Sequence, residues 1–294
     1  MTQKKTERKK LDDLNLMDKF LFDATMEHVE AYEAALSILM ENEIYLLEKP
    51  ETEKELRLSP DIRQVRLDVI SMDTDSKIYY MEMQKENTRN LIRRSRYYQA
   101  QLDVSLLEPG VANFNRLNDA CFILIAPFDI FGRGLFRYTF EGVCRECPDL
   151  KLEDGAIRIF INTHGTNRED FSQEFLDFMD YIAETTDERA EASESERIKL
   201  IHRNVKKVKN SEKMGVKYMQ AWEEKVIVRE EGRAEGRIEG RVDAVLSLLE
   251  ELSAVPKCVR DTVSEEEDIN KLGIWLKLAA RANSLEEFRA QAGI

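Results

Sequence analysis

Two carboxylates, Asp68 and Glu82, stand inside strand-like runs of the sequence that are otherwise mostly apolar. A charge buried in such a strand needs a cation or hydrogen bonds to compensate for the water that it loses. If the two runs pair as a hairpin, Asp68 lies opposite Glu82, and the pair offers the hard oxygen ligands that Mg²⁺ prefers. A bound Mg²⁺ can polarise a phosphate and lower the pKa of a water molecule. The spacing is therefore compatible with phosphodiester hydrolysis.

Glu82 and Gln84 share one face of their strand because side chains two residues apart point the same way, whereas Met83 points to the other face. An alternative interpretation is open at this point. Asp68 would begin a turn and Glu82 would face solvent on an edge strand, as ordinary half-exposed carboxylates do. The spacing by itself favours this alternative, because an Asp followed by thirteen residues and Glu-x-Gln carries little information.

The elements that must position these side chains follow from hydrophobic periodicity. The two strand-like runs span 65–71 and 77–84, and the turn-rich residues between them predict an antiparallel hairpin. The surrounding pattern predicts a helix at about 25–41, a loop at 42–60, a helix with a basic stripe at 88–107, and strands at 121–126, 135–141 and 156–161. The strand at 121–126 is a short continuous apolar run, which is typical of a strand buried on both faces. Helix, hairpin, helix and strand together predict an α/β core.

The C-terminal part of the chain, from about residue 169, is expected to be helical. Glu-Gly-Arg occurs three times at a four-residue period within 230–242, and a glycine inside a helix costs about 1 kcal/mol relative to alanine. We therefore expect a hinge or a marginal helix there. The expected organisation is a basic disordered tail (1–14), a core (15–168), a helical extension packed on the core (169–229), the Glu-Gly-Arg hinge or helix (230–242) and a small helical unit (243–294).

The formal net charge of −13 is unusual for a partner of nucleic acid, because Lys and Arg drive phosphate binding. The local distribution of charge matters more than the total. Acidic residues concentrate at 184–196 and 262–268, whereas basic residues gather at 89–96 and 197–217. The second basic segment also carries apolar residues at helical spacing, so it either follows a DNA backbone or packs on the core, and we favour packing. A chain with two basic segments is compatible with DNA as a partner.

Several classes of protein are disfavoured by the composition. No run approaches the roughly 18 to 20 apolar residues of a membrane span, and the basic N-terminus lacks an apolar leader segment. We therefore expect a cytoplasmic protein without a membrane partner, whose four cysteines are reduced thiols. Cys144 and Cys147 form one CxxC, which lacks the second pair of ligands that zinc needs. The three histidines are scattered, so no catalytic histidine is implied, and no organic cofactor is expected.

A series of short motifs runs through the chain in a fixed order. The motifs are VRLDV at 65–69, YMEMQ at 80–84, RSRYYQ at 94–99 with Asp103 and Gly110 after it, FILI to FD at 122–129, YTF at 138–140 and FINT to Gly at 160–165. Together they resemble the PD-(D/E)XK nuclease family transposases, also called the recombination-promoting nuclease (Rpn) family. The resemblance covers roughly residues 15–230, and the chained motifs are far more specific than any one of them.

The resemblance implies a restriction-endonuclease-like core, with a central mixed sheet flanked by helices, and DNA cleavage that depends on Mg²⁺ or Mn²⁺. It also implies an association with mobile elements or recombination, in the bacterial cytoplasm and in action at the nucleoid. Carried over by position, Asp68 and Glu82 are metal ligands, with the backbone carbonyl of Met83 as a third. Glu30 or Glu33 is the candidate for a further ligand from the first helix.

Gln84 departs from the broader superfamily, which often has a lysine at this position. A lysine can stabilise an attacking hydroxide by its charge, whereas an amide is neutral and only hydrogen-bonds. Gln84 therefore cannot be a general base, although it completes the predicted catalytic set with Asp68 and Glu82. Lys85 or an arginine would then supply the missing charge.

Basic residues near the hairpin are the expected contacts to DNA phosphates. They are Lys85, Arg89, Arg93, Arg94 and Arg96. The alternative is an exposed helix face on which these arginines pair with nearby acids.

The leading functional hypothesis is an active metal-dependent DNA endonuclease. The second hypothesis is a catalytically weak or inactive protein that keeps the nuclease fold and binds DNA or a partner. A transposase in the strict sense is a third, but nothing in the sequence supplies strand-transfer machinery. A homodimer would suit double-strand cleavage, because two sites related by a twofold axis can address two antiparallel strands.

Overall fold

The computed structural model describes residues 8–56, 65–107 and 110–294. It divides into two units, Met1–Tyr218 and Met219–Ile294, each with a hydrophobic core of its own. The division falls after Tyr218, whereas the sequence suggested divisions after residues 168, 229 and 242. Within the described ranges, no helix is long and apolar enough to cross a membrane.

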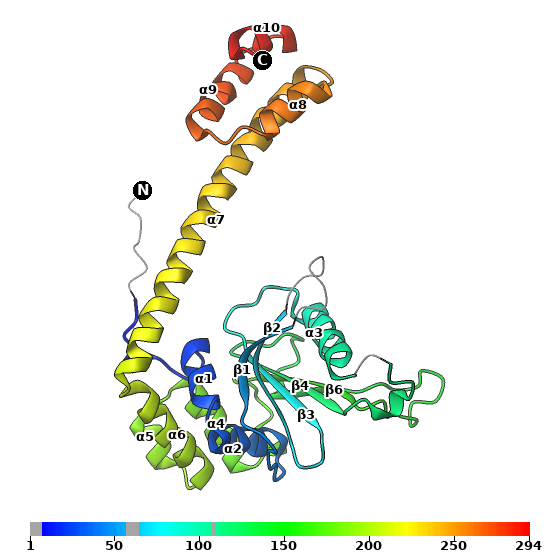
Figure 1. Cartoon of the computed structure of the whole chain (residues 1–294), viewed down its shortest axis with the longest axis vertical. Coiled ribbons are helices and arrows are strands. Elements are labelled where there is room, and N and C mark those ends of the chain that lie inside the picture. The colour runs from blue at the N-terminus through cyan, green and yellow to red at the C-terminus, as the bar shows by residue number, and fades with distance from the viewer. Residues whose placement is uncertain (1–7, 57–64, 108–109) are drawn as a thin grey trace. The chain divides into compact units, whose positions relative to one another are not determined.

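The first unit is built on a mixed sheet, in which the described residues form six strands in the order β1-β2-β3-β4-β6-β5 (Figure 1). The strands are β1 (Glu51–Leu56), β2 (Val65–Met72), β3 (Ile78–Met83), β4 (Ala120–Ala126), β5 (Arg137–Phe140) and β6 (Ala156–Asn162). The strands β1, β2 and β3 are antiparallel neighbours, β4 is parallel to β3 and β6, and β5 is antiparallel to β6. The predicted α/β fold with a mixed sheet is therefore confirmed.

The predicted hairpin is also confirmed. Strands β2 and β3 pair antiparallel, with Val69 opposite Met81 and Ile70 opposite Tyr80. Strand β4 is buried along its whole length, as its continuous apolar run predicts, because it lies in the middle of the sheet with helices over both faces. The candidate site residues of the hairpin are thus held next to a buried central strand.

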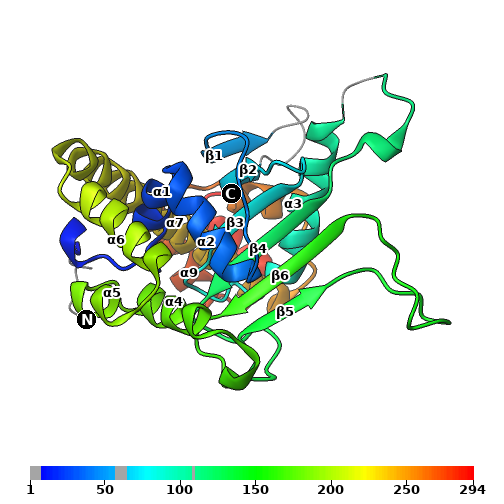
Figure 2. The same cartoon turned by 90° about the horizontal axis from the view of Figure 1, so that it is seen from below.

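Helices cover the two faces of the sheet unequally. The helices of this unit are α1 (Lys19–Met26), α2 (Val29–Met40), α3 (Leu91–Leu106), α4 (Gln173–Ala183), α5 (Asp187–Ala192), α6 (Glu196–Lys209) and the start of α7 (Glu212–Leu252). Figure 2 shows α1, α2, α4 and α6 on one face and α3 on the other. Tyr79 and Met81 of β3 pack with the first group, whereas Ile78 and Tyr80 pack with α3. Glu82 is in phase with Tyr80 and therefore belongs to the α3 face.

The helix predicted at 25–41 is wrong in its extent, because the structure has two helices there. The first, α1, ends at Met26, and α2 begins at Val29 after His28 adopts extended backbone angles (φ −84°, ψ 120°). Only Thr25 and Met26 of α1 fall within the predicted range, so most of this helix is missing from the prediction. This missed helix carries two side chains of the site described below.

The loop predicted at 42–60 is also partly wrong. Residues 51–56 form β1, the edge strand that pairs with β2, while residues 57–60 lie outside the described part of the chain. The sequence of β1 is almost entirely polar, and four of its six residues are charged. An edge strand can be polar because one side of it faces water, so hydrophobic periodicity does not reveal it.

The N-terminal segment packs on the core from at least Leu11 onward, in contrast to the disordered tail predicted at 1–14. Leu11–Asp13 form a short 3-10 turn and Leu14 is buried. The backbone N–H of Leu16 donates to Thr185 Oγ1 (2.8 Å), and Lys209 Nζ donates to the carbonyl of Asp12 (2.8 Å). The backbone of this segment is thus hydrogen-bonded to Thr185, just after α4, and to Lys209 at the end of α6. Residues 1–7 lie outside the described part.

The second unit is helical. The C-terminal part of α7 packs with α8 (Lys257–Ser264), α9 (Ile269–Ala279) and α10 (Leu285–Ala292) around a core that includes Leu249, Trp275 and Phe288. The Glu-Gly-Arg repeats form a continuous part of α7 rather than a hinge. A Cβ atom added at Gly232, Gly236 or Gly240 would meet no atom within 4 Å, so the described structure does not require glycine at these positions.

Candidate active site

The hairpin brings Asp68 and Glu82 together. Val69 pairs with Met81, and continuing this register by one position places Asp68 opposite Glu82 on the adjacent strand. Each residue is only 6% exposed. The alternative of two half-exposed carboxylates, one in a turn and one on an edge strand, does not describe this structure, because both side chains are buried and β3 lies inside the sheet.

A third carboxylate, Asp23, comes from α1. Lys19 lies four residues before Asp23, so one face of the helix carries both side chains. The ammonium of Lys19 donates to Asp23 Oδ2 (2.9 Å) and to Asp68 Oδ1. Asp23 is 7% exposed, and its other oxygen, Oδ1, has no hydrogen-bond partner among the described residues. Asp23 was missed in the sequence, although a Lys-x₃-Asp pair within an apolar helix is a detectable signal.

Glu82 is held by two neighbours. Tyr80 OH donates to Glu82 Oε2 (2.9 Å), and Arg94 from α3 donates through Nη2 to Glu82 Oε1. The same nitrogen of Arg94 donates to Gln84 Oε1 (2.6 Å), and the guanidinium lies 5.6 Å from the ring centre of Tyr98. Arg94 therefore fixes the orientation of both Glu82 and Gln84, which the sequence predicted to be catalytic.

Burial raises the pKa of all three carboxyl groups. It raises the pKa of Glu82 from 4.5 to about 7, with a further contribution from the negative charge of Asp68 and opposition from Arg94. It raises the pKa of Asp23 from 3.8 to about 8, with Asp68 adding to the shift and Lys19 opposing it. The pKa of Asp68 is raised by burial too, although Lys19 and the backbone N–H of Met83 favour its charged form. Three carboxyls with raised pKa values in one place are typical of a functional site.

These shifts predict how stability depends on pH. Between pH 4 and pH 8 the folded state keeps protons on Asp23 and Glu82 that the unfolded state has released, so the stability that these two groups contribute is fully present at low pH and is lost as pH rises through about 8. Asn at position 23 never ionises. We expect Asp23→Asn to become more stable relative to the wild type by on the order of 2 kcal/mol between pH 5 and pH 8, measured by urea unfolding. An equal difference at both pH values would contradict the raised pKa of Asp23.

The donor chemistry of the cluster fits a divalent cation. Carboxylate oxygens are the ligands that Mg²⁺ prefers, and Asp23 Oδ1 is a buried oxygen without a hydrogen-bond partner among the described residues. In the arrangement described here, Lys19 and Arg94 bind the oxygens that a metal would take. Accordingly, no group of three His, Cys, Asp or Glu side chains in the described residues is close enough to hold a metal ion. A cation would therefore have to displace the ammonium of Lys19 from Asp68 and Asp23.

The two glutamates predicted as helical ligands lie elsewhere on α2. Glu33 accepts a hydrogen bond from the backbone N–H of Leu46 (2.7 Å), and Glu30 lies 3.9 Å from the ammonium of Lys207. The acidic side chain that a helix does supply to the hairpin is Asp23 of α1. The carbonyl of Met83 as a ligand stays a prediction; Met83 is the last residue of β3.

The predicted DNA-binding residues separate into two groups. Arg93 and Arg96 are exposed on α3, and Arg89 is exposed just before its start. Arg94 instead points to Glu82, because successive residues of a helix are rotated by about 100°. Lys85 is exposed and its ammonium binds Asp18 (2.9 Å). The helix thus presents one arginine to the carboxylates and leaves its neighbours at the surface.

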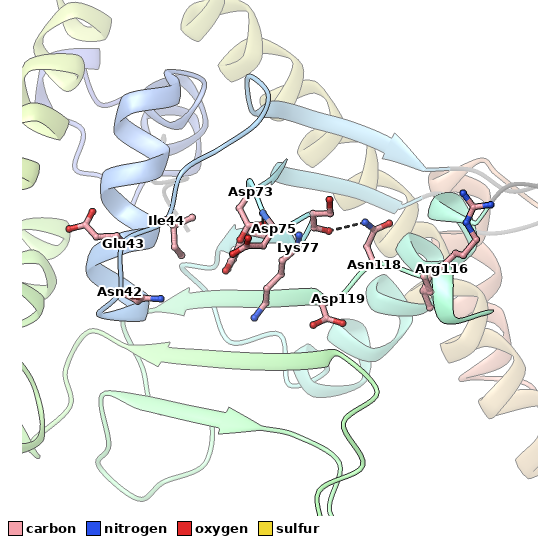
Figure 3. Close-up of a pocket in the computed structure, with 12 residues that line it drawn as sticks. Asn42, Glu43, Ile44, Asp73, Asp75, Lys77, Arg116, Asn118 and Asp119 are labelled. Atoms are coloured by element: carbon pink, nitrogen blue, oxygen red, sulfur yellow. Dashed lines mark hydrogen bonds between the residues drawn. The ribbon is translucent and has the colours of Figure 1, made fainter. Parts of the chain in front are cut away.

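A polar cavity of about 530 Å³ lies at the other end of β3 and β4, beside their first residues (Figure 3). Its lining includes Asp73, Asp75, Lys77 and Asp119. The carboxylate of Asp73 accepts hydrogen bonds from the backbone N–H groups of Asp75 and Lys77 (2.9 Å each), so it stabilises the turn of the hairpin. This cavity is distinct from the cluster of Asp23, Asp68 and Glu82, which lies toward the end of β3.

A scan against protein-family models and searches of curated proteins and of solved structures found no match for this chain.

Proposed function

We propose that this protein is a divalent-metal-dependent DNA endonuclease with a restriction-endonuclease-like core. The observation that carries the proposal is the burial of three carboxyl groups, Asp23, Asp68 and Glu82, at adjacent positions of α1, β2 and β3. A protein core gains nothing from three such groups, because each loses hydration on burial. Their convergence beside a helix with exposed arginines supports binding of a metal and of a phosphate backbone.

The residues of the chain have separate tasks in this proposal. Asp68 and Glu82 would hold the metal, with Asp23 as a third carboxylate nearby, and the metal would polarise the scissile phosphate and activate water. Arg94 fixes Glu82, and Gln84 orients a polar group by hydrogen bonding without taking its proton. In the reaction, the oxygen of water adds to phosphorus, the bond from phosphorus to one ester oxygen breaks, and that oxygen receives the proton that water loses.

The architecture supports the same proposal. A mixed sheet with helices on both faces is the arrangement that the resemblance to PD-(D/E)XK nucleases implies, and the hairpin carries the matching motifs. The association with mobile elements or recombination rests on that resemblance.

The direct test is the conversion of supercoiled plasmid to nicked and linear forms. We expect cleavage with Mg²⁺ or Mn²⁺, no cleavage after removal of the metal with EDTA, and recovery when Mn²⁺ is restored in excess. Undiminished cleavage in EDTA would exclude the metal-dependent mechanism.

A second candidate is a nuclease-like fold that binds DNA with weak or no catalysis. It is favoured by the neutral Gln84, whose amide oxygen binds Arg94 and whose nitrogen donates to the carbonyl of Glu86 (2.7 Å). This candidate predicts DNA binding in the plasmid experiment without metal-dependent cleavage.

The exposed arginines of α3 predict the salt dependence of DNA binding. Replacing Arg93 and Arg96 with alanine removes two phosphate contacts, so the slope of log K against log salt should become shallower by about 1.8. Fluorescence anisotropy of a labelled duplex, with EDTA to prevent cleavage, measures this slope. The control variant Arg145→Ala/Lys151→Ala removes two exposed charges elsewhere and should leave the slope unchanged. Equal slopes for the wild type and the α3 variant would argue against phosphate contacts there.

A further inference from the structure

We propose that Lys19 is the displaceable counter-ion of the metal site and the cation that serves the reaction in place of a lysine at position 84. Its ammonium donates hydrogen bonds to Asp68 and Asp23 while no metal is bound. If those oxygens held a divalent cation, the ammonium of Lys19 would be released and could interact with the phosphate and the attacking water. The role in turnover rests on the proposed function, whereas the role as a counter-ion does not.

Two cationic side chains next to Gln84, Lys85 in the chain and Arg94 by contact, already have acidic partners. The ammonium of Lys85 binds Asp18 (2.9 Å), so this side chain is held by an acid outside the cluster of Asp23, Asp68 and Glu82. Arg94 is fixed by Glu82 and Gln84 and by its position 5.6 Å from the ring of Tyr98. Arg94 therefore serves to hold Glu82 in place.

Lys19 has the required position and freedom. Its ammonium binds one carboxylate of the hairpin, Asp68, and one of α1, Asp23, so it lies at the centre of the proposed ligand set. Its side chain is 45% exposed, whereas those of Asp68 and Asp23 are buried, so the lysine reaches the carboxylates from the solvent side. A lysine carries a compact charge on a flexible four-carbon stem, which allows the charge to move a short distance without moving the helix.

Competition between Lys19 and a metal follows from elementary electrostatics. Asp68 Oδ1 already binds the ammonium, and a divalent cation on the same oxygen would repel that ammonium at contact distance. The displaced ammonium remains tethered to α1, beside the bound metal and open to solvent. A phosphodiester that reaches the metal from solvent meets this charge, which favours a hydroxide-like attacking water and the negative charge that builds on the phosphate oxygens. The bond changes are those of hydrolysis given above.

The test compares Lys19→Met, which removes the charge and keeps the length, with Lys19→Arg, which keeps a charge. Mn²⁺ affinity is measured without DNA by electron paramagnetic resonance, and single-turnover cleavage is measured at saturating Mn²⁺. Lys19→Met should bind Mn²⁺ about tenfold more tightly because its competitor is gone, yet cleave about a hundredfold more slowly. Lys19→Arg should recover part of the rate. Lys151→Met, which removes an exposed lysine paired with Glu141, should match the wild type in both measurements.

Each outcome decides one part of the inference. Weaker or unchanged Mn²⁺ binding by folded Lys19→Met would overturn the role of Lys19 as a counter-ion. A wild-type cleavage rate in Lys19→Met at saturating Mn²⁺ would overturn its role in turnover. If the wild-type chain cleaves no DNA, the proposed function fails and the role in turnover fails with it. Tighter Mn²⁺ binding by Lys19→Met would in that case still support the counter-ion.

Discussion

Replacing Glu82 with glutamine is expected to slow metal-dependent DNA cleavage by about a hundredfold or more while leaving the chain folded. Glutamine keeps the shape of the side chain and an oxygen that can accept from Tyr80, but it removes the negative charge that a metal ligand needs. Burial already raises the pKa of Glu82 to about 7, so the neutral form is well tolerated by the fold. The rate of plasmid nicking at saturating Mn²⁺ and the melting temperature together measure the effect.

The matched control for this variant is Glu141→Gln. Glu141 is an exposed glutamate that pairs with Lys151, so losing its charge should change neither cleavage nor stability appreciably. A folded Glu82→Gln protein that cleaves at the wild-type rate would exclude Glu82 from the active site.

The second large effect concerns the pH dependence of metal binding. A metal binds carboxylates only in their ionised form, so it must displace protons from Asp23 and Glu82, whose pKa values are about 8 and about 7. Between pH 6 and pH 8 both groups ionise, and the affinity for Mn²⁺ should rise by about a hundredfold over this range. Isothermal titration calorimetry in two buffers of different ionisation enthalpy measures both the affinity and the number of protons released.

Asp23→Asn provides the internal comparison. This variant has one fewer proton to release, so its affinity should depend less steeply on pH and its proton release at pH 7 should be smaller. If Asp68 and Glu82 alone bound the Mn²⁺, the affinity would depend on pH equally in the wild type and in Asp23→Asn. That result would exclude Asp23 as a metal ligand.

The parts of the fold that could be predicted are those in which one strand or helix carries its own signal. Strand β4 is a continuous apolar run, and β2 and β3 are separated by a turn-rich segment, so the hairpin follows from local residues alone. Strand β1 carries no such signal, because its side chains are almost entirely polar. What makes it a strand is its pairing with β2, which its own residues do not indicate. Edge strands of this kind are recognised only once the rest of the sheet is known.

Of the site, the sequence could predict only the residues that belong to one local motif. Asp68 and Glu82 belong to one hairpin, and their proximity follows from its register. Asp23 lies forty-five residues before Asp68; the spacing of Lys19 and Asp23 indicates a pair on one helix face, but nothing in the sequence indicates that this pair meets Asp68. The prediction of Glu30 or Glu33 chose α2 because its apolar stripe is the clearer one, whereas the shorter α1 carries the acid that reaches the hairpin.

The order of synthesis has a consequence for this site. The segment that carries α1 is fastened to α4 and α6, for example by the hydrogen bond from Leu16 to Thr185, which joins residues 169 positions apart. The N-terminal residues leave the ribosome before α4 and α6 have been synthesised, so α1 cannot pack in its final position until these partners are present. Contacts over such separations also form slowly, because closing a long loop costs entropy before it gains any contact. A nascent or truncated chain that ends before α4 therefore contains all three carboxylates in its sequence but has not yet assembled them into one cluster.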